Sequence, residues 1–338
     1  MNIFLTGGTG LLGSNIINCL LDNNYSIKSL VRSNSDMDVM QSKGIKGIKG
    51  DLIDVKSFAK ELIDCQVLIH AGAYFSEYFK NKSNENLLYE VNVKGTSLLF
   101  EEAHKAGVHN FIYISSSCVF NSNWPDIITE NTPYAENNDN PYFKSKTEAE
   151  ISLLKLAEKY ISMRLIILSP ALMMGPGDKA PTRMGEFVLN YLTGKIPAIL
   201  PIKMAFVDAR DVAKAVVAAI TKGINGERYL IGGNVYEMSE VVKVLSEITM
   251  KPIPKIRPSL KMTMFLSRIM TFKSKLTGKP SKLPSISELK RMSTQKGYSS
   301  EKAKKEFNIQ FHTLFETLSA TVNWYIDNHY IHQFRGTT

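Results

Sequence analysis

Cysteines, long apolar runs and a basic leader are all scarce or missing in this chain of 338 residues. The three cysteines, Cys19, Cys65 and Cys118, lie far apart and form neither a disulfide framework nor a metal-ligand spacing. We therefore expect a reducing, cytoplasmic environment. The longest apolar runs, such as 165–174, are too short to span a bilayer. An apolar segment starts directly after Met1, with no basic region before it, so we expect no signal peptide.

The six histidines also lack the spacing of a ligand set, so we expect no bound metal. His70 could be interpreted as a general base. Its position at the end of an apolar run that should be a buried strand favours a structural role, in which it positions the backbone.

Acidic residues are nearly absent from one long segment. Residues 251–305 contain fifteen lysines and arginines but only two glutamates, a net charge of +13, whereas the whole chain carries +9. The basic character is therefore local. It indicates an anionic partner near this segment and argues against a protein that coats nucleic acid.

What the sequence does contain begins with the run IFLTGGTGLLG at 3–13. An apolar stretch meets spaced glycines, and an apolar helical pattern follows, which is the context of a dinucleotide-binding fingerprint. Gly7 or Gly8 would allow the turn out of the strand. Gly10 would let the backbone approach a pyrophosphate, and Gly13 would let the helix pack closely. The free N–H groups at the helix start would face the phosphates.

Strands and helices alternate along the first half of the chain. Strands are predicted near 27–31, 45–48, 67–70, 111–114 and 164–168, and helical segments near 55–62, 87–106 and 142–160. Asn140 is the expected N-cap of the last helix, and Pro141 occupies its first turn. This order predicts an α/β fold, a Rossmann-type doubly wound parallel sheet with helices on both faces.

Beyond Pro170 the pattern loosens. Helices are expected at 183–193, 211–222 and 239–249, the last with Ser239 as its cap, and a final helix carries Trp324. We predict a dinucleotide-binding domain over 1–170 and a smaller, interwoven substrate-binding lobe over 171–338, with segments near 206–222 returning to the sheet. The lobe should cover the carboxyl edge of the strands, where open α/β sheets bind ligands.

Two groups of polar residues fall where that edge is expected. Tyr142 and Lys146 are four residues apart and so share one face of a helix. A fixed ammonium would lower the tyrosine pKa toward the range of a useful acid–base group. Ser115, Ser116 and Ser117 directly follow the fifth predicted strand and could hydrogen-bond a substrate carbonyl. A surface helix and a polar strand-end turn are the ordinary alternatives.

Together these residues resemble the extended short-chain dehydrogenase/reductase family. The matching stretches are TGGTGLLG at 6–13, Asp51-Leu52, NVKGT at 92–96, Ser116, Tyr142 with Lys146, and FVDARDVA at 206–213. Within that family, 226–233 and 298–303 are similar to the dihydroflavonol-reductase-like group, and especially to bacterial hopanoid-associated sugar epimerases. Gly72, Phe120-Asn121 and Ser169-Pro170 depart from the common pattern, which weakens a sugar-nucleotide assignment more than a dehydrogenase assignment.

The resemblance implies a mechanism. Ser116 and Tyr142 would hold a carbonyl, Tyr142 would transfer its proton, and Lys146 would bind the nicotinamide ribose. It also implies cofactor contacts from Thr6, Gly7, Gly10, Leu11, Leu12, Gly13, Arg32, Ser33, Asp51, Leu52, Ala71, Ala73, Tyr142, Lys146 and Pro170. The expected substrate residues are Tyr74, Phe75, Tyr78 and Ser117, although a packed loop would equally explain the three aromatic residues.

We interpret the chain as an NADP-dependent reductase of a ketone or aldehyde. The alternative is a nucleotide-sugar epimerase or dehydratase with tightly bound NAD(P). A non-catalytic NADP-binding protein is a third class, and the intact Ser116, Tyr142 and Lys146 argue against it. NADP(H) is preferred to NAD(H) because Arg32-Ser33 ends the second strand and no acid follows before Asp36. An arginine can pair with a 2′-phosphate that a carboxylate would repel.

Two segments suggest contacts with partners. Helices at 87–106 and 142–160 bear apolar residues on more than one face, and similar families pair such helices across a two-fold axis, so we expect a homodimer. Burial within one chain is the alternative. Residues 260–276 resemble a basic amphipathic helix. A lid whose apolar side covers the substrate pocket is the favoured interpretation, and peripheral docking to an anionic membrane is the other.

Overall fold

The computed structural model describes residues 1–74, 85–122, 124–136, 140–277 and 283–331. Its main sheet has seven parallel strands in the order β3-β2-β1-β4-β5-β6-β9. The strands are β1 Asn2–Thr6, β2 Ser26–Val31, β3 Lys46–Lys49, β4 Val67–His70, β5 Asn110–Ile114, β6 Arg164–Pro170 and β9 Arg228–Ile231. The first six confirm the predicted strands, and the whole sheet confirms the predicted Rossmann-type fold.

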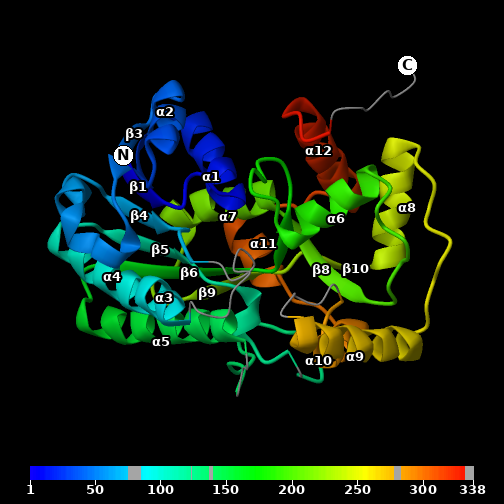
Figure 1. Ribbon diagram of the computed structural model, residues 1–338. Helices are drawn as coiled ribbons and strands as arrows, with labels where there is room; N and C mark the ends of the chain where they lie inside the picture. Colours follow the sequence, from blue (N-terminus) through cyan, green and yellow to red (C-terminus); the bar gives the residue numbers. More distant parts are fainter. Residues whose placement is uncertain (75–84, 123, 137–139, 278–282, 332–338) are drawn as a thin grey trace.

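Helices cover both faces of this sheet (Figure 1). On one face lie α1 Leu11–Asp22, α2 Asn34–Ser42, α7 Ala209–Lys222 and α11 Glu301–Phe307, and on the other lie α3 Glu85–Tyr89, α4 Thr96–Lys105 and α5 Pro141–Lys159. Side chains of β1 alternate between the two cores: Ile3 and Leu5 face α1, and Phe4 faces α4. Burial on both faces explains why the central strands β1, β4, β5 and β6 contain unbroken apolar runs.

Two predicted helical segments differ in detail. The segment near 55–62 forms two short 3₁₀ turns, η1 Leu52–Ser57 and η2 Ala59–Leu62. The predicted helix 87–106 is divided between α3 and α4 by a π-helical turn, η5 Glu90–Gly95. A Cβ on Gly95 would lie 2.4 Å from the carbonyl oxygen of Leu52, so this close approach requires a glycine. Apolar spacing does not distinguish a π turn from an α-helix, and π turns are frequent at functional sites.

A second lobe surrounds a three-stranded sheet of order β10-β8-β7. Its strands are β7 Leu172–Met174, β8 Lys203–Asp208 and β10 Asn234–Glu237, and its helices are α6 Arg183–Leu192, α8 Met238–Thr249, α9 Leu260–Thr277, α10 Ile286–Thr294 and α12 Leu314–Asp327. These strands, and helices α2, α10 and α11, were not expected from the sequence. Ser239 is not the cap of α8, because Glu237 and Glu240 form a capping box there.

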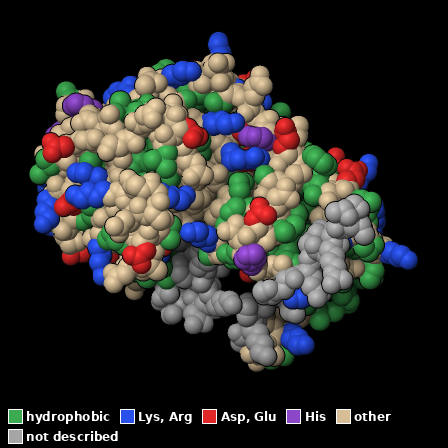
Figure 2. Space-filling view, turned by 90° about the horizontal axis from the view of Figure 1, so that it is seen from above, with side chains coloured by type: hydrophobic (Ala, Val, Ile, Leu, Met, Phe, Trp, Pro, Cys, Tyr) green, Lys and Arg blue, Asp and Glu red, His purple; other side chains and the backbone are tan. Residues whose placement is uncertain are grey.

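None of the helices within the described ranges is long and apolar enough to cross a membrane. The surface seen from above mixes lysines and arginines with aspartates and glutamates (Figure 2). The excess positive charge of 251–305 is therefore not a property of every face of the molecule.

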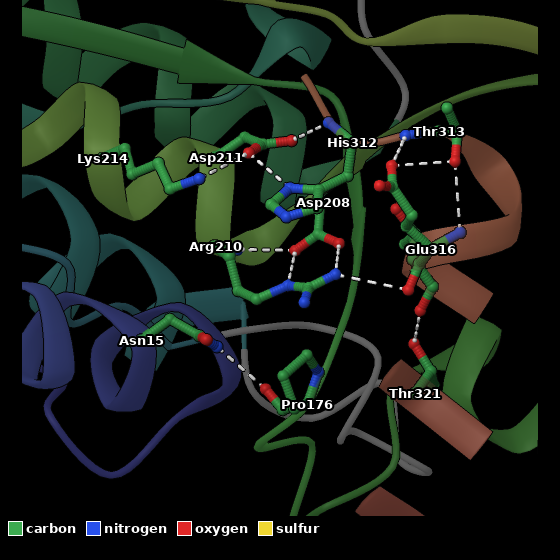
Figure 3. Close-up of polar contacts among 11 residues, drawn as sticks. Asn15, Pro176, Asp208, Arg210, Asp211, Lys214, His312, Thr313, Glu316 and Thr321 are labelled. Carbon is green, nitrogen blue, oxygen red and sulfur yellow. Dashed lines mark hydrogen bonds and ion pairs between the residues drawn. The ribbon is translucent and has the colours of Figure 1, made fainter. Parts of the chain in front are cut away.

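A polar seam joins the second lobe to the main sheet (Figure 3). The Asp208 carboxylate accepts hydrogen bonds from the Arg210 backbone and guanidinium at 2.6–2.9 Å, and Arg210 also donates to the Glu316 carbonyl at 3.3 Å. Asp211 accepts from the backbone and ring of His312 at 2.7 and 2.6 Å. Burial alone would raise the pKa of Asp208, but its bonds to Arg210 outweigh burial and hold the pKa below its usual value. The FVDARDVA stretch thus fixes α7 against the start of α12.

Candidate active site

The glycine turn between β1 and α1 is shaped by close contacts. Gly7 has a φ of +77°, and a Cβ on it would lie 2.7 Å from the backbone of Ala71. A Cβ on Gly13 would lie 2.0 Å from the carbonyl oxygen of Gly7. At Gly10 the nearest atom to such a Cβ is 3.6 Å away, so the protein itself leaves space there.

That space adjoins the start of α1. Gly10 is the N-cap and has no side chain to bond the first-turn N–H groups. These groups carry the positive end of the helix dipole and suit a phosphate. The cradle therefore fits the pyrophosphate of a dinucleotide, and its Leu11 and Leu12 begin the helix as buried anchors.

The residues expected near the adenine end of a cofactor already have local contacts. Arg32 is exposed at the end of β2. Ser33 caps α2, accepting from the Asp36 backbone N–H at 3.1 Å and donating to the Asp36 carboxylate at 2.7 Å. Asp51 caps η1 by accepting from the Ile53 N–H at 3.1 Å. Ser33 therefore has a structural function, as the cap of α2, that could not be seen in the sequence. Of these two residues, Arg32 is the one whose side chain is exposed.

His70 occupies a closed polar site behind the glycine turn. Its Nδ1 lies 2.7 Å from Thr6 Oγ1 and its Nε2 lies 2.9 Å from Thr96 Oγ1. Thr6 Oγ1 also accepts from the Gly72 N–H at 3.0 Å. Burial, aided by the charge of Lys146, lowers the pKa of His70 to about 3, so the ring is neutral at pH 7. These contacts fit the structural role expected from the sequence.

Helix α5 brings Tyr142 and Lys146 against the end of β5. Asn140 caps the helix by accepting from the Tyr142 N–H at 3.0 Å, and Pro141 is the first helical residue, as predicted. The Lys146 ammonium donates to the Ile114 carbonyl at 2.7 Å, and it is only 3% exposed. Burial lowers the pKa of Lys146 to about 8. The Lys146 ammonium is therefore held where it has lost most of its contact with water. It lies at the end of β5, which Ser115, Ser116 and Ser117 follow directly.

Two of those serines occupy the short turn that follows β5. Ser116 Oγ accepts from the Cys118 N–H at 3.3 Å and caps the turn Ser117–Val119. Ser117 is buried and hydrogen-bonds Tyr298. Nearby, a pocket of about 350 Å³ is lined by residues of two segments, 122–128 and 291–298. Arg291 from this lining lies 5.8 Å from the Phe143 ring centroid, which places the pocket beside the start of α5.

Asn92, in the π turn, connects the loop after β4 to α5. Its Oδ1 accepts from the Tyr74 N–H at 2.7 Å, and its Nδ2 donates to the Tyr74 carbonyl at 2.9 Å and to Ser145 Oγ at 3.0 Å. Ser145 Oγ donates to the Tyr142 carbonyl at 2.8 Å. The NVKGT stretch was recognised in the sequence, but this role of Asn92 was not. Tyr74 is fixed by these bonds, whereas Phe75 and Tyr78 lie outside the described residues.

Glu150 is a second residue that sequence reasoning missed. Its side chain is fully buried, accepts a hydrogen bond from Ser115, and accepts from the Tyr134 hydroxyl at 3.1 Å. The Arg228 guanidinium donates to it at 3.3 Å. Glu150 follows Lys146 by four residues, so the shared helix face was a signal that could have identified it. It ties Ser115, the residue before Ser116, to the face of α5 that carries Lys146.

The comparisons with known proteins assign the family. Residues 3–232 match the model of the NAD dependent epimerase/dehydratase family, and the chain belongs to this family. It is 28% identical over 97% of its length to a putative dihydroflavonol 4-reductase of Synechocystis sp., of which it covers 95%. It is 30% identical over 76% of its length to sterol demethylase protein B of Methylococcus capsulatus, of which it covers 77%.

The structural comparison agrees. The crystal structure of gox2253 matches with a TM-score of 0.83 at 26% identity, over 96% of this chain and 98% of that one. The protein is therefore an NAD(P)-dependent oxidoreductase or epimerase of the extended short-chain dehydrogenase/reductase type, as the resemblance implied.

Proposed function

We propose that this protein is an NADP-dependent reductase of a ketone or aldehyde and that Ser116, Tyr142 and Lys146 are its catalytic residues. The observation that carries the proposal is the buried Lys146 ammonium. Lys146 lies on the same face of α5 as Tyr142, and its ammonium donates a hydrogen bond to the carbonyl of Ile114 at the end of β5. A bound nicotinamide cofactor supplies hydride transfer. The glycine cradle of 7–13 would hold its pyrophosphate.

The side chains have separate tasks in this reduction. Tyr142 donates its proton to the substrate oxygen as negative charge develops there. Ser116 donates a hydrogen bond to the same oxygen, which stabilises that charge. Lys146 favours the phenolate that remains on Tyr142, because an adjacent positive charge stabilises an anion. Asn92 and Glu150 act as positioning residues through Ser145 and Ser115.

The cofactor preference depends on Arg32. Its guanidinium would pair with the 2′-phosphate of NADP(H). NAD(H) lacks this phosphate, so the guanidinium would have no anion to pair with there. We expect Arg32→Ala to weaken NADPH binding by about 1.5–3 kcal/mol and to leave NADH binding nearly unchanged. Lys43→Ala, an exposed cation at the other end of α2, is the matched control for loss of one charge. Dissociation constants for both cofactors decide, and wild-type binding of NADH as tight as that of NADPH would contradict the assignment.

The second candidate is an epimerase or dehydratase acting on a nucleotide sugar, which the family assignment supports. Such an enzyme returns the hydride to its substrate and keeps its cofactor. The experiment is to assay the supernatant of denatured, purified protein for nucleotide, and then to follow NADPH oxidation with a panel of small carbonyl compounds. Net consumption of NADPH supports the reductase. Stoichiometric bound NAD(P) without net consumption supports the epimerase.

A homodimer through α4 and α5 belongs to the same proposal. Leu98 and Leu154 are only partly buried within the single chain, although both pack against its core. A two-fold partner would cover them. Sedimentation at micromolar concentration tests this, because a monomer there would exclude the assembly.

A further inference from the structure

Helix α9 turns its small polar side inward and its large apolar side outward. Thr263 and Ser267 are 1% and 0% exposed, and Ser267 Oγ donates to the Pro284 carbonyl at 2.6 Å. On the other side, the exposed fractions are Met262 52%, Phe265 60%, Leu266 42%, Ile269 50%, Phe272 65% and Leu276 72%. The favoured expectation, a lid whose apolar side covers the substrate pocket, is wrong for these six side chains. We call them the α9 stripe.

The α9 stripe is continuous along the helix. Its members recur every three or four residues, so they share one face over the whole length of α9. The helix lies along the outer edge of the second lobe beside α10 (Figure 1). Six neighbouring large apolar side chains on a surface are unfavourable in water, and such patches mark a site of interaction.

The charge around the stripe selects its occupant. Residues 251–287 contain nine lysines and arginines and no aspartate or glutamate. Lys261, Arg268 and Lys273 lie on α9 itself and are exposed. Lys255 and Arg257 precede the helix and are exposed as well. Each cation near an anionic lipid surface adds to binding, and the apolar face adds the burial of its side chains.

A second copy of the chain is a poorer occupant. A two-fold interface places the same patch on both sides, so the exposed cations on α9 would meet those of the other copy. The segment 251–287 contains no acid to compensate them. Like charges opposed in this way are repulsive. An anionic bilayer instead offers both negative headgroups and an apolar interior.

We propose that α9 docks this protein onto an anionic lipid bilayer. The α9 stripe enters the boundary between headgroups and acyl chains, and the exposed cations Lys255, Arg257, Lys261, Arg268 and Lys273 remain at the headgroups. Helix α10 packs beside α9, and its Arg291 lines the pocket near Phe143. Docking therefore places that pocket close to the bilayer surface.

The test is flotation of the full-length protein with vesicles. One set contains phosphatidylcholine alone, and the other an equimolar mixture of phosphatidylcholine and phosphatidylglycerol. We expect the protein to float with the mixed vesicles, at least tenfold more than with the neutral ones, and to be released as NaCl rises from about 50 to about 500 mM. No flotation, or equal flotation with both sets that ignores salt, overturns the proposal.

Variants separate the two contributions. Phe265→Ser with Phe272→Ser should reduce flotation at least tenfold, and Lys261→Gln with Arg268→Gln and Lys273→Gln should remove the preference for the mixed vesicles. Phe315→Ser with Lys243→Gln is the matched control, because it removes an exposed aromatic ring and an exposed cation from α12 and α8. The control should float as the wild type does.

Three results with these variants would contradict the proposal. The first is unchanged flotation of the phenylalanine variant. The second is equal loss of flotation in the control. The third is a wild-type oligomer that the phenylalanine variant dissociates while wild type fails to float, which would make a second copy the occupant. The charge variant keeps the test valid if the phenylalanine variant does not fold.

Discussion

Helices α5 and α9 are nearly equal in length, 19 and 18 residues, and each reverses the usual distribution of side chains. Helix α5 buries Lys146 and Glu150, whereas α9 exposes two phenylalanines and four other large apolar residues. Buried charges lose solvation, and exposed rings order water. We have proposed a cofactor and substrate as the reason for the first reversal, and a lipid bilayer as the reason for the second.

The two reversals differ in what compensates them within the chain. On α5, Lys146 has the Ile114 carbonyl, and Glu150 has Ser115, Tyr134 and Arg228. On α9, solvent covers at least two-fifths of each side chain of the α9 stripe. The buried charges of α5 therefore have their partners within the chain, whereas the α9 stripe would gain stabilisation only when another surface covers it.

The largest effect should come from removing the buried Glu150 carboxylate on α5, because its hydrogen-bonding partners then lose their acceptor. Glu150→Ala leaves Ser115 and the partly buried Arg228 without their carboxylate, and we expect a loss of about 3–5 kcal/mol in the free energy of unfolding. Glu158→Ala, an exposed glutamate on the same helix, should change it by less than about 0.5 kcal/mol. Urea titration of both variants measures the difference. Equal stability of the two would show that Glu150 is not held as described.

The next effect is on chemistry alone. Tyr142→Phe should leave folding and cofactor affinity nearly intact and reduce turnover about 10²-fold or more, because the proton donor is lost. Tyr160→Phe removes a hydroxyl just beyond the far end of α5 and should keep near wild-type turnover. The readouts are turnover with a confirmed carbonyl substrate, the cofactor dissociation constant and the melting temperature. Turnover of Tyr142→Phe near that of the wild type would refute the proposed mechanism.

Lys146 should lower the stability of the folded state, although we propose that activity requires it. Its pKa is lowered by burial from 10.5 to about 8, so the folded state holds this proton less tightly than the unfolded chain does. Below pH 8 the folded state therefore carries a penalty, which is relieved as pH rises from about 8 to 10.5. We expect Lys146→Met to lose activity but to gain about 1–3 kcal/mol of stability at pH 7, and to lose that advantage near pH 10.5. A variant that is less stable than wild type at pH 7 would contradict this sign.

The local part of this architecture could be predicted from the sequence. Strands β1, β4, β5 and β6 each contain an unbroken apolar run, and α5 has its own cap in Asn140, so neighbouring residues specify them. The partners of the site could not be predicted in the same way. Arg228 is 78 residues from Glu150, and Tyr74 is 18 residues from Asn92. Only the folded sheet brings such pairs together.

The same limit applies to β9 and α9. Strand β9 has four residues, and its assignment depends on pairing with β6 rather than on its own pattern. For α9, the sequence specifies an amphipathic helix but not which face is buried. Thr263 and Ser267 are buried on the inner face, Leu260 and Met264 pack against the core of the second lobe, and the α9 stripe stays outside.

The smallest effect should come from α9, and it sharpens the contrast with α5. Phe272→Ala removes a ring that is 65% exposed, so we expect the free energy of unfolding to change by less than about 0.5 kcal/mol. Leu153→Ala on α5 removes a fully buried side chain and should cost about 2–5 kcal/mol. Urea unfolding of the lipid-free protein compares them. A loss of more than about 2 kcal/mol at Phe272 would mean that another part of the protein, or a second copy, already packs on this ring in solution. The α9 stripe would then be an internal interface, and the resemblance between the two reversed helices would end there.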